Sequence, residues 1–342
     1  FIDEESVQAH VKGADATRDL AVIAVSIDAV KETTLEQIAV AQMGDSNKLQ
    51  VGEPAIAIGN ALGYGQSVTT GIVSAVNNNK LGVCGIAGGS GNKDGVKIMS
   101  IQTFRGEAGA SLRNTAKAIQ YAADNGAHIL QCSWGYTAWS GSPYDSGIRN
   151  DNSYKSACRL EAEAIDYFVA NGGDEDGPIE GGLAIFAGGN DGYGFTGYPA
   201  AYKPCVAVAA ISPSLRPTYY TNFGIGTDIA APGGEGVYAN GAILSTVPEE
   251  FSDPSIPNYG MMQGTSQACP HVSGVAALGL SYAKQLGKRY SASEFRSMLL
   301  SATNNIDPFL TGSLKITFEN GATQTISYPA YKGKLGAGYI DA

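Results

Sequence analysis

Residues 264–272 read GTSQACPHV and place a serine, Ser266, between a glycine turn and an apolar stretch. The apolar residues that follow, as far as Gly287, recur at helical spacing and predict a helix. Pro270 fits the first part of that helix, because backbone N–H groups there have no intrahelical partner to lose. A serine in this place can cap the helix, or it can act as a nucleophile beside outward-pointing N–H groups.

The chain around this stretch alternates apolar runs with helical patterns, which predicts a parallel sheet covered by helices. Strands are expected at residues 96–101, 129–133, 184–187 and 206–210. Helices are expected at residues 110–125, 161–171 and 291–302, and a polar hairpin at residues 314–328. The last helix opens with a serine of the type that caps helices. The predicted fold class is therefore α/β.

Composition limits the classes of protein that this chain can be. Its 342 residues are 44% hydrophobic and 16% charged, which is typical of a globular chain with a large core. The net charge of −10, with scattered Lys and Arg, argues against a nucleic-acid partner. No apolar run reaches the length of a membrane span, and the start at Phe1, without a signal peptide, suggests a cut end.

The five cysteines show no C-x-x-C spacing. Cys84, Cys132, Cys205 and Cys269 lie among apolar or small residues, which is typical of buried free thiols. An odd number of cysteines leaves at least one thiol unpaired within a monomer. The sequence therefore predicts buried free thiols rather than a metal or redox motif.

The stretch around Ser266 resembles the motif G-T-S-M-A-x-P-H-V-A-G of the subtilisin-like serine peptidases, and it departs modestly from it at Gln267 and Cys269. Residues 187–192, AGGNDG, resemble the A-A-G-N-x-G turn of the same family. The resemblance runs from about residue 77 to the end of the chain. It implies a subtilisin-like parallel sheet flanked by helices, with Ser266 as nucleophile.

The same resemblance implies further site residues. Asn190 would donate its side-chain amide to the oxyanion, and the neighbouring Gly188 would contact the substrate. Residues 131–135, QCSWG, resemble the family's N-M-S-L-G strand, whose edge pairs with an extended peptide. Ser133, Trp134 and Gly135 would accordingly bind the substrate.

The chain lacks a histidine where the family has its general base. In this family the triad follows the order Asp, His, Ser, and the histidine precedes a small-residue helix. Residues 71–77, GIVSAVN, fit that helix, but residues 65–70, GQSVTT, stand in front of it. His10, His128 and His271 are the three histidines of the sequence, and each is expected to be structural or solvated.

Residues 19–22, DLAV, and residues 68–74, VTTGIVS, make the segment 1–76 resemble an HtrA-type trypsin-like serine peptidase fragment. In that family Asp19 would be the triad aspartate. The segment is expected to be β-rich, with strands at residues 20–27 and 54–59. Two domains follow from this interpretation, residues 1–76 and 77–342, as if two peptidases were joined at a shared G-I-V-S-A phrase. Alternatively, Asp28 is the orienting carboxylate of a subtilisin-like strand.

The resemblances imply a serine-type endopeptidase that hydrolyses polypeptides through an acyl-enzyme on Ser266. Two alternatives are a catalytically inactive peptide-binding module and an HtrA-type protease or chaperone. No cofactor is required for such chemistry, no metal ligands are assigned, and calcium is left open. A secreted or cell-envelope location is implied by the family.

Overall fold

The computed structural model describes most of the chain. The described residues are 6–15, 20–35, 54–59, 67–72, 85–88, 95–104, 110–136, 148–238, 241–247, 252, 258–318 and 320–340. The chain divides into two compact units, Phe1–Leu49 and Gln50–Ala342. The domain boundary between residues 76 and 77 rests on sequence resemblance and remains a prediction.

The described part of the smaller unit is an antiparallel strand pair followed by two short helical segments. Strand β1 (Ala9–Asp15) pairs with β2 (Leu20–Val25), and the register shifts once, between Val11 and Gly13. The 3-10 turn η1 (Ile27–Ala29) and helix α1 (Glu32–Leu35) follow. The strand expected at residues 20–27 thus ends at Val25, since η1 begins at Ile27.

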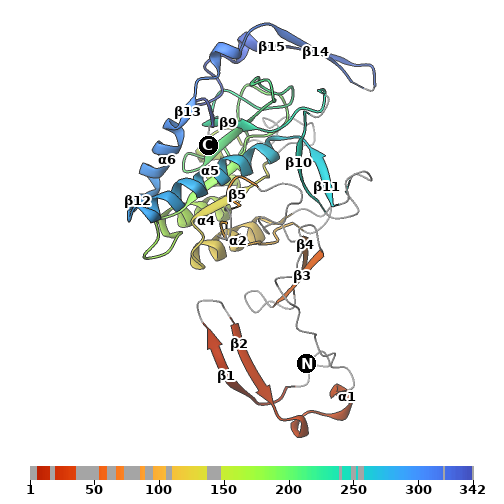
Figure 1. The fold of residues 1–342 in the computed structure, drawn as a ribbon, viewed down its shortest axis with the longest axis vertical. Helices are drawn as coiled ribbons and strands as arrows, with labels where there is room; N and C mark the ends of the chain where they lie inside the picture. The colour runs from red at the N-terminus through yellow and green to blue at the C-terminus, as the bar shows by residue number, and fades with distance from the viewer. Residues whose placement is uncertain are drawn as a thin grey trace. The chain divides into compact units, whose positions relative to one another are not determined.

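The larger unit is built on a six-stranded sheet in the order β13-β16-β9-β8-β7-β5 (Figure 1). Its strands are β5 (Ile129–Cys132), β7 (Leu183–Ala187), β8 (Val206–Ile211), β9 (Ile229–Pro232), β13 (Thr303–Asn304) and β16 (Tyr339–Ile340). All neighbouring strands are parallel except β13, which pairs antiparallel with β16. The α/β class and the strands expected from residues 129, 184 and 206 are confirmed.

One expected strand is absent. Residues 95–104 are described without regular structure, although residues 96–101 were expected to form a strand. Ile98 is 69% exposed and Met99 is 41% exposed. A mainly apolar segment such as residues 96–101, VKIMSI, forms a buried strand only where other elements cover it, and the side chains of Ile98 and Met99 are not covered.

The helices of the larger unit pack around its sheet. They are α2 (Leu112–Asp124), α3 (Asp151–Ala157), α4 (Arg159–Asn171), α5 (Thr265–Gln285) and α6 (Ala292–Ser301). As the sequence predicts, Ser291 caps α6, in a capping box with Glu294. Helix α3, which opens with a capping box at Asn150, was not predicted.

Strand β7 shows how the sheet separates two layers of core. Ala184 and Phe186 belong to a hydrophobic cluster that includes buried residues of α2 and α4. Ile185 and Ala187 belong to a second cluster, which includes buried residues of α5 and α6. Successive side chains of a strand point to opposite faces. Because helices cover both faces, every residue of β7 is buried.

Short strand pairs complete the larger unit. They are β3 (Pro54–Gly59) with β4 (Ser67–Ile72), β6 (Ile179–Glu180) with β12 (Tyr290–Ser291), β10 (Ile243–Thr246) with β11 (Tyr259–Met262), and β14 (Ser313–Thr317) with β15 (Thr323–Ser327). The β14–β15 pair is the expected hairpin, and the 3-10 turns η7 (Asp307–Phe309) and η8 (Tyr328–Tyr331) flank it. Among the described helices, none has the length and apolarity to cross a membrane.

The cysteines of the described part behave as the sequence predicts. Cys132, Cys205 and Cys269 are buried free thiols, whereas Cys84 lies outside the described residues. Burial raises the pKa of all three thiols, in the case of Cys269 to about 12. Such thiols are protonated near neutral pH and act as small apolar groups in the core.

Candidate active site

The expected site residues gather where parallel strands end. Residues 133–136, which we call the edge segment, follow β5, and residues 188–191 follow β7. Ser266 is the second residue of α5. Ligands of open α/β sheets bind beside the carboxyl ends of the strands, so the topology alone favours a site here.

Gly264 sets the start of the helix that carries Ser266. Its φ of 151° lies in a region that residues with a side chain rarely adopt, and a Cβ there would lie 2.9 Å from Oε1 of Gln267. The Gly264 N–H donates to the carbonyl of Gly233, which follows β9. This turn delivers Ser266 at the helix N-terminus, where free N–H groups favour negative charge.

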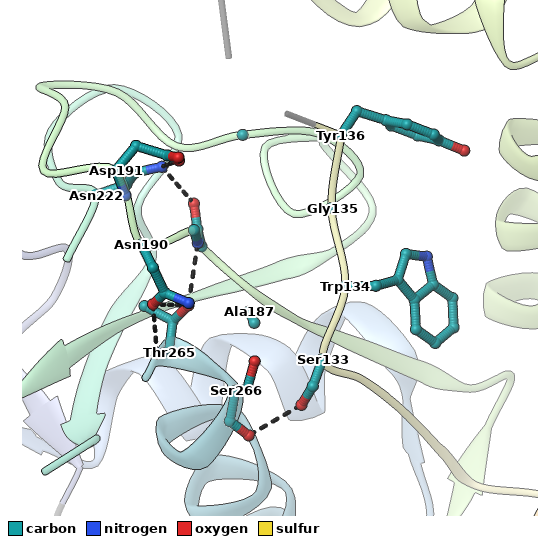
Figure 2. A pocket seen from close by; sticks show the side chains of 13 residues that line it. Ser133, Trp134, Gly135, Tyr136, Ala187, Asn190, Asp191, Asn222, Thr265 and Ser266 are labelled. Carbon is teal, nitrogen blue, oxygen red and sulfur yellow. Dashed lines mark hydrogen bonds between the residues drawn. The ribbon is translucent and has the colours of Figure 1, made fainter. Parts of the chain in front are cut away.

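The side chain of Asn190 is held in one orientation by Thr265. Oδ1 of Asn190 accepts hydrogen bonds from the Thr265 backbone N–H at 2.8 Å and from its hydroxyl at 2.9 Å. The Thr265 hydroxyl oxygen in turn accepts from the N–H of Gly189. Because both partners of Oδ1 are donors, the Asn190 NH2 group faces away from them (Figure 2). Thr265 was not predicted as a site residue.

Ser133 joins the edge segment to the start of α5. Its hydroxyl donates to the backbone carbonyl of Ser266 at 2.9 Å and accepts from the Gln131 amide at 2.8 Å (Figure 2). Gln131 of the end strand β5 and the nucleophile turn are therefore connected through the Ser133 hydroxyl group. This contact fixes the near end of the edge segment.

The far end of the edge segment is fixed by the chain around Tyr198. The N–H of Tyr136 donates to the Tyr198 carbonyl at 2.9 Å. A Cβ on Gly135 would lie 3.2 Å from the same carbonyl oxygen, so a larger residue would crowd this contact. Trp134 packs edge-on against Phe186 of β7, with ring centroids 5.5 Å apart.

A buried asparagine that the sequence analysis missed organises the turn after β7. Asn222 is 0% exposed. Its Oδ1 accepts from the N–H groups of Asp191 and Tyr193, and its Nδ2 donates to the Gly188 carbonyl and the Asp191 carboxylate. Every hydrogen bond that its side chain makes with the described residues goes to one loop, 29 to 34 residues earlier in the chain. No local motif points to such a distant partner.

These segments enclose a pocket of about 150 Å³. Its lining includes Ser133, Trp134, Gly135, Gly188, Asn190 and Ser266, all of which the sequence assigns to the site. Asp191 is the carboxylate among the described lining residues. Figure 2 shows the edge segment on one side of this pocket and the Asn190 turn on the other.

None of the three histidines is among the residues that line the pocket. His271 lies one turn beyond Ser266 in α5, and its Nδ1 contacts the Gln267 carbonyl at 2.7 Å. His128 precedes β5, at the end of that strand opposite Ser133, and lies 3.7 Å from Asp174. Burial lowers the pKa of His128, and Lys284 adds to this effect while Asp174 opposes it.

The remaining expected residues lie in the smaller unit. His10 is an exposed residue of β1, and Asp28 is an exposed residue of η1. Asp19 lies outside the described residues. Within the described part of the chain, no group of three or more His, Cys, Asp or Glu side chains could hold a metal ion.

Comparison with known proteins identifies the family. The sequence model of the subtilase family matches residues 43–337. Alkaline elastase YaB of Bacillus sp. (strain YaB) is 31% identical over 75% of this chain and 53% of its own length. Subtilisin Savinase of Lederbergia lenta is 28% identical over 75% of this chain and 74% of its own.

Two further relatives extend this comparison. An extracellular protease of Xanthomonas campestris pv. campestris is 31% identical over 62% of this chain and 32% of its own length. Among solved structures, a lanthipeptide protease matches 60% of this chain and 62% of its own, with 23% identity and a TM-score of 0.47.

The family match also bears on the first quarter of the chain. The match begins at residue 43 and therefore overlaps the segment 1–76. The comparisons do not support the expected resemblance of this segment to an HtrA-type peptidase. The chain spans about half the length of curated relatives such as the elastase, which it covers to 53%. With a match over most of its residues, the chain belongs to the subtilase family.

Proposed function

We propose that this chain is a serine-type endopeptidase that hydrolyses polypeptides through an acyl-enzyme on Ser266. One observation carries the proposal: Ser266 and Asn190, whose side-chain amide is oriented by Thr265, line the same pocket. The Ser266 hydroxyl would attack the peptide carbonyl carbon, and Asn190 would stabilise the developing oxyanion. Water would then hydrolyse the ester, without any cofactor.

The proposed substrate is an extended polypeptide lying along the edge segment. β5 is the end strand in the order of the main sheet, and residues 133–135 continue from it into the pocket lining. An added peptide strand would take its affinity from main-chain hydrogen bonds and its specificity from the pocket. A cavity of about this size can hold a molecule such as benzene, so a medium-sized apolar side chain fits.

The attack needs an acceptor for the Ser266 proton, and that group later returns the proton to the leaving amine. In the subtilase arrangement this acceptor is a histidine. His10, His128 and His271 are the candidates in these residues, and none lines the pocket. Replacing each histidine singly by alanine tests whether one of them activates Ser266.

The proposal is tested by labelling the purified chain with a fluorophosphonate probe, followed by mass spectrometry of the labelled peptide. We expect one labelled site, Ser266, and no labelling of the matched Ser266→Ala variant. If the wild type stays unlabelled but binds extended peptides, the endopeptidase proposal is wrong and the chain is a peptide-binding module.

We further propose that the protein works outside the cytoplasm, in the medium or the cell envelope. The support is family membership, together with relatives whose names describe extracellular proteases. Immunodetection of the protein in culture supernatant, cell envelope and cytoplasmic fractions tests this location. Recovery in the cytoplasmic fraction alone would contradict it.

A further inference from the structure

A buried carboxylate lies behind the edge segment. Glu161, in the first turn of α4, is 0% exposed. Among the described residues, no cation lies within ion-pair distance of it. A buried charge is costly unless hydrogen bonds satisfy it. The stability of this arrangement therefore depends on the donors that Glu161 finds.

Among the described residues Glu161 has three side-chain donors, and two of them come from the edge segment. Oε2 of Glu161 accepts from the Tyr136 hydroxyl at 2.7 Å, and Oε1 accepts from the Trp134 indole N–H at 3.4 Å. Tyr154 of α3 supplies the third bond, from its hydroxyl to Oε2 at 2.8 Å. The carboxylate thus holds the pocket wall and, through Tyr154, a neighbouring helix.

The spacing of Trp134 and Tyr136 explains how one carboxylate reaches both. Side chains two residues apart in an extended segment point to the same face. Figure 2 shows both rings on the side of the edge segment that faces away from Asn190. The hydroxyl of Ser133, by contrast, points to Ser266. Glu161 therefore contacts the edge segment on the face that points away from Asn190.

The phenolic hydroxyl groups of Tyr136 and Tyr154 remain hydrogen-bond donors near neutral pH. Burial raises the pKa of Tyr136 and of Tyr154, and the nearby charge of Glu161 raises both further. Each hydroxyl stays protonated near neutral pH and donates a charge-assisted hydrogen bond, which is stronger than a neutral one. Glu161 therefore keeps both phenolic donors near neutral pH.

We propose that Glu161 is a positioning residue for substrate: by holding Trp134 and Tyr136 from behind, it sets the peptide-binding edge and the pocket wall. The inference rests on the proposed function, in which the edge segment binds polypeptide. Ser133 keeps its own contact with Ser266, so loss of the Glu161 contacts should weaken peptide binding and leave the nucleophile in place.

The test separates binding from reactivity by using two measurements. Peptide affinity is measured by fluorescence anisotropy of a labelled eight-residue peptide in a Ser266→Ala background. Nucleophile reactivity is measured as the fluorophosphonate labelling rate of chains that keep Ser266. We expect Glu161→Gln to raise the peptide Kd about tenfold, as loss of charge-assisted hydrogen bonds implies, and to leave the labelling rate nearly unchanged.

Glu163→Gln is the matched control. Glu163 lies on the same helix, is exposed, and pairs with Arg159 at 2.7 Å; its replacement should change neither measurement. An unchanged Kd in Glu161→Gln, or a parallel fall in labelling, would overturn the proposal. Labelling failure in the wild type would refute the endopeptidase proposal alone, because the Kd comparison needs no turnover.

A milder variant covers the case in which Glu161→Gln fails to fold. Tyr136→Phe removes one donor and leaves Tyr154 on the same carboxylate oxygen. We expect its peptide Kd to rise about threefold, the loss of one hydrogen bond of a group that retains others. An unchanged Kd in this variant would also contradict the proposal.

Discussion

The two walls of the pocket are supported by different means. The wall formed by residues 188–191 and 264–266, the amide wall, is held by hydrogen bonds of two uncharged side chains, Thr265 and Asn222. The opposite wall, the edge segment, is held from behind by the charge of Glu161. Uncharged side chains fix the direction of one donor, the Asn190 amide, whereas the buried carboxylate of Glu161 fixes the position of a whole segment. The difference predicts that replacing the oriented donor Asn190 in the first wall affects kcat, whereas variants in the second wall affect KM.

The largest expected effect is in the amide wall. Asn190→Ala removes the proposed oxyanion donor and should lower kcat by about 10² to 10³, with little change in KM; this magnitude comes from a subtilisin. Steady-state kinetics on a peptide amide measures it. A rise in KM with an unchanged kcat would assign Asn190 to substrate binding instead.

The next effect tests the support of that wall. Asn222→Ala leaves the N–H groups of Asp191 and Tyr193 without their buried partner. We expect a loss of about 3 kcal/mol in the free energy of unfolding, measured by urea denaturation. Asn320→Ala, at an exposed position whose side chain accepts one backbone bond, is the control. Equal losses in both variants would show that Asn222 has no special role.

A second buried glutamate extends the comparison to pH. Glu235 is 0% exposed, accepts one bond from the Tyr219 N–H, and has no partner for Oε2 among the described residues. Glu235 lies two residues after Gly233, and the carbonyl of Gly233 accepts a hydrogen bond from the N–H of Gly264 in the amide wall. Burial raises the pKa of Glu235 from 4.5 to about 7, partly opposed by the Tyr219 bond.

Burial favours the protonated form of Glu235, so the folded state binds this proton more tightly than the unfolded state does. Glu235 contributes its full stability below pH 4.5, and this contribution is lost as pH rises to about 7. Glu235→Gln should therefore gain about 2 kcal/mol over the wild type between pH 4.5 and pH 8. Urea denaturation at both pH values measures the gain. A constant difference between the two chains would contradict the prediction.

The smallest expected effect concerns the mouth of the pocket. Asp191 contributes a carboxylate to the lining and is partly exposed, so solvent screens its charge. Asp191→Asn should lower kcat/KM about threefold for substrates with Lys before the scissile bond, relative to Leu. Paired peptide substrates measure this ratio. An equal change for both substrates would show that the charge does not select the side chain.

The contrast between the walls also shows what the sequence could reveal. Ser266 and Asn190 lie in local motifs that read directly as a strand or helix end, and the structure brings them to one pocket. Thr265 acts on a residue 75 positions away, and Glu161 acts on side chains 25 and 27 positions away. A single polar residue with a distant partner leaves no periodic signal, so neither role could be predicted.

The same reasoning explains the errors in the fold. Strands β7 and β8 are covered on both faces, and their apolar runs predicted them well. Residues 96–101 are also mainly apolar, although Lys97 and Ser100 interrupt them; Ile98 is largely exposed and no strand forms there. Composition shows which segments can be buried, whereas the packing of distant segments decides which of them are.

The hydroxyl of Ser133 bears on which peptide bond of a bound substrate would lie next to Ser266. It ties the start of the peptide-binding edge to the residue proposed to cut. The proposed peptide-binding segment and the proposed nucleophile are therefore held at a fixed position relative to each other by this hydrogen bond. Changes farther along the edge segment or in the pocket can alter which side chain is accepted, while the bond presented to Ser266 stays the same.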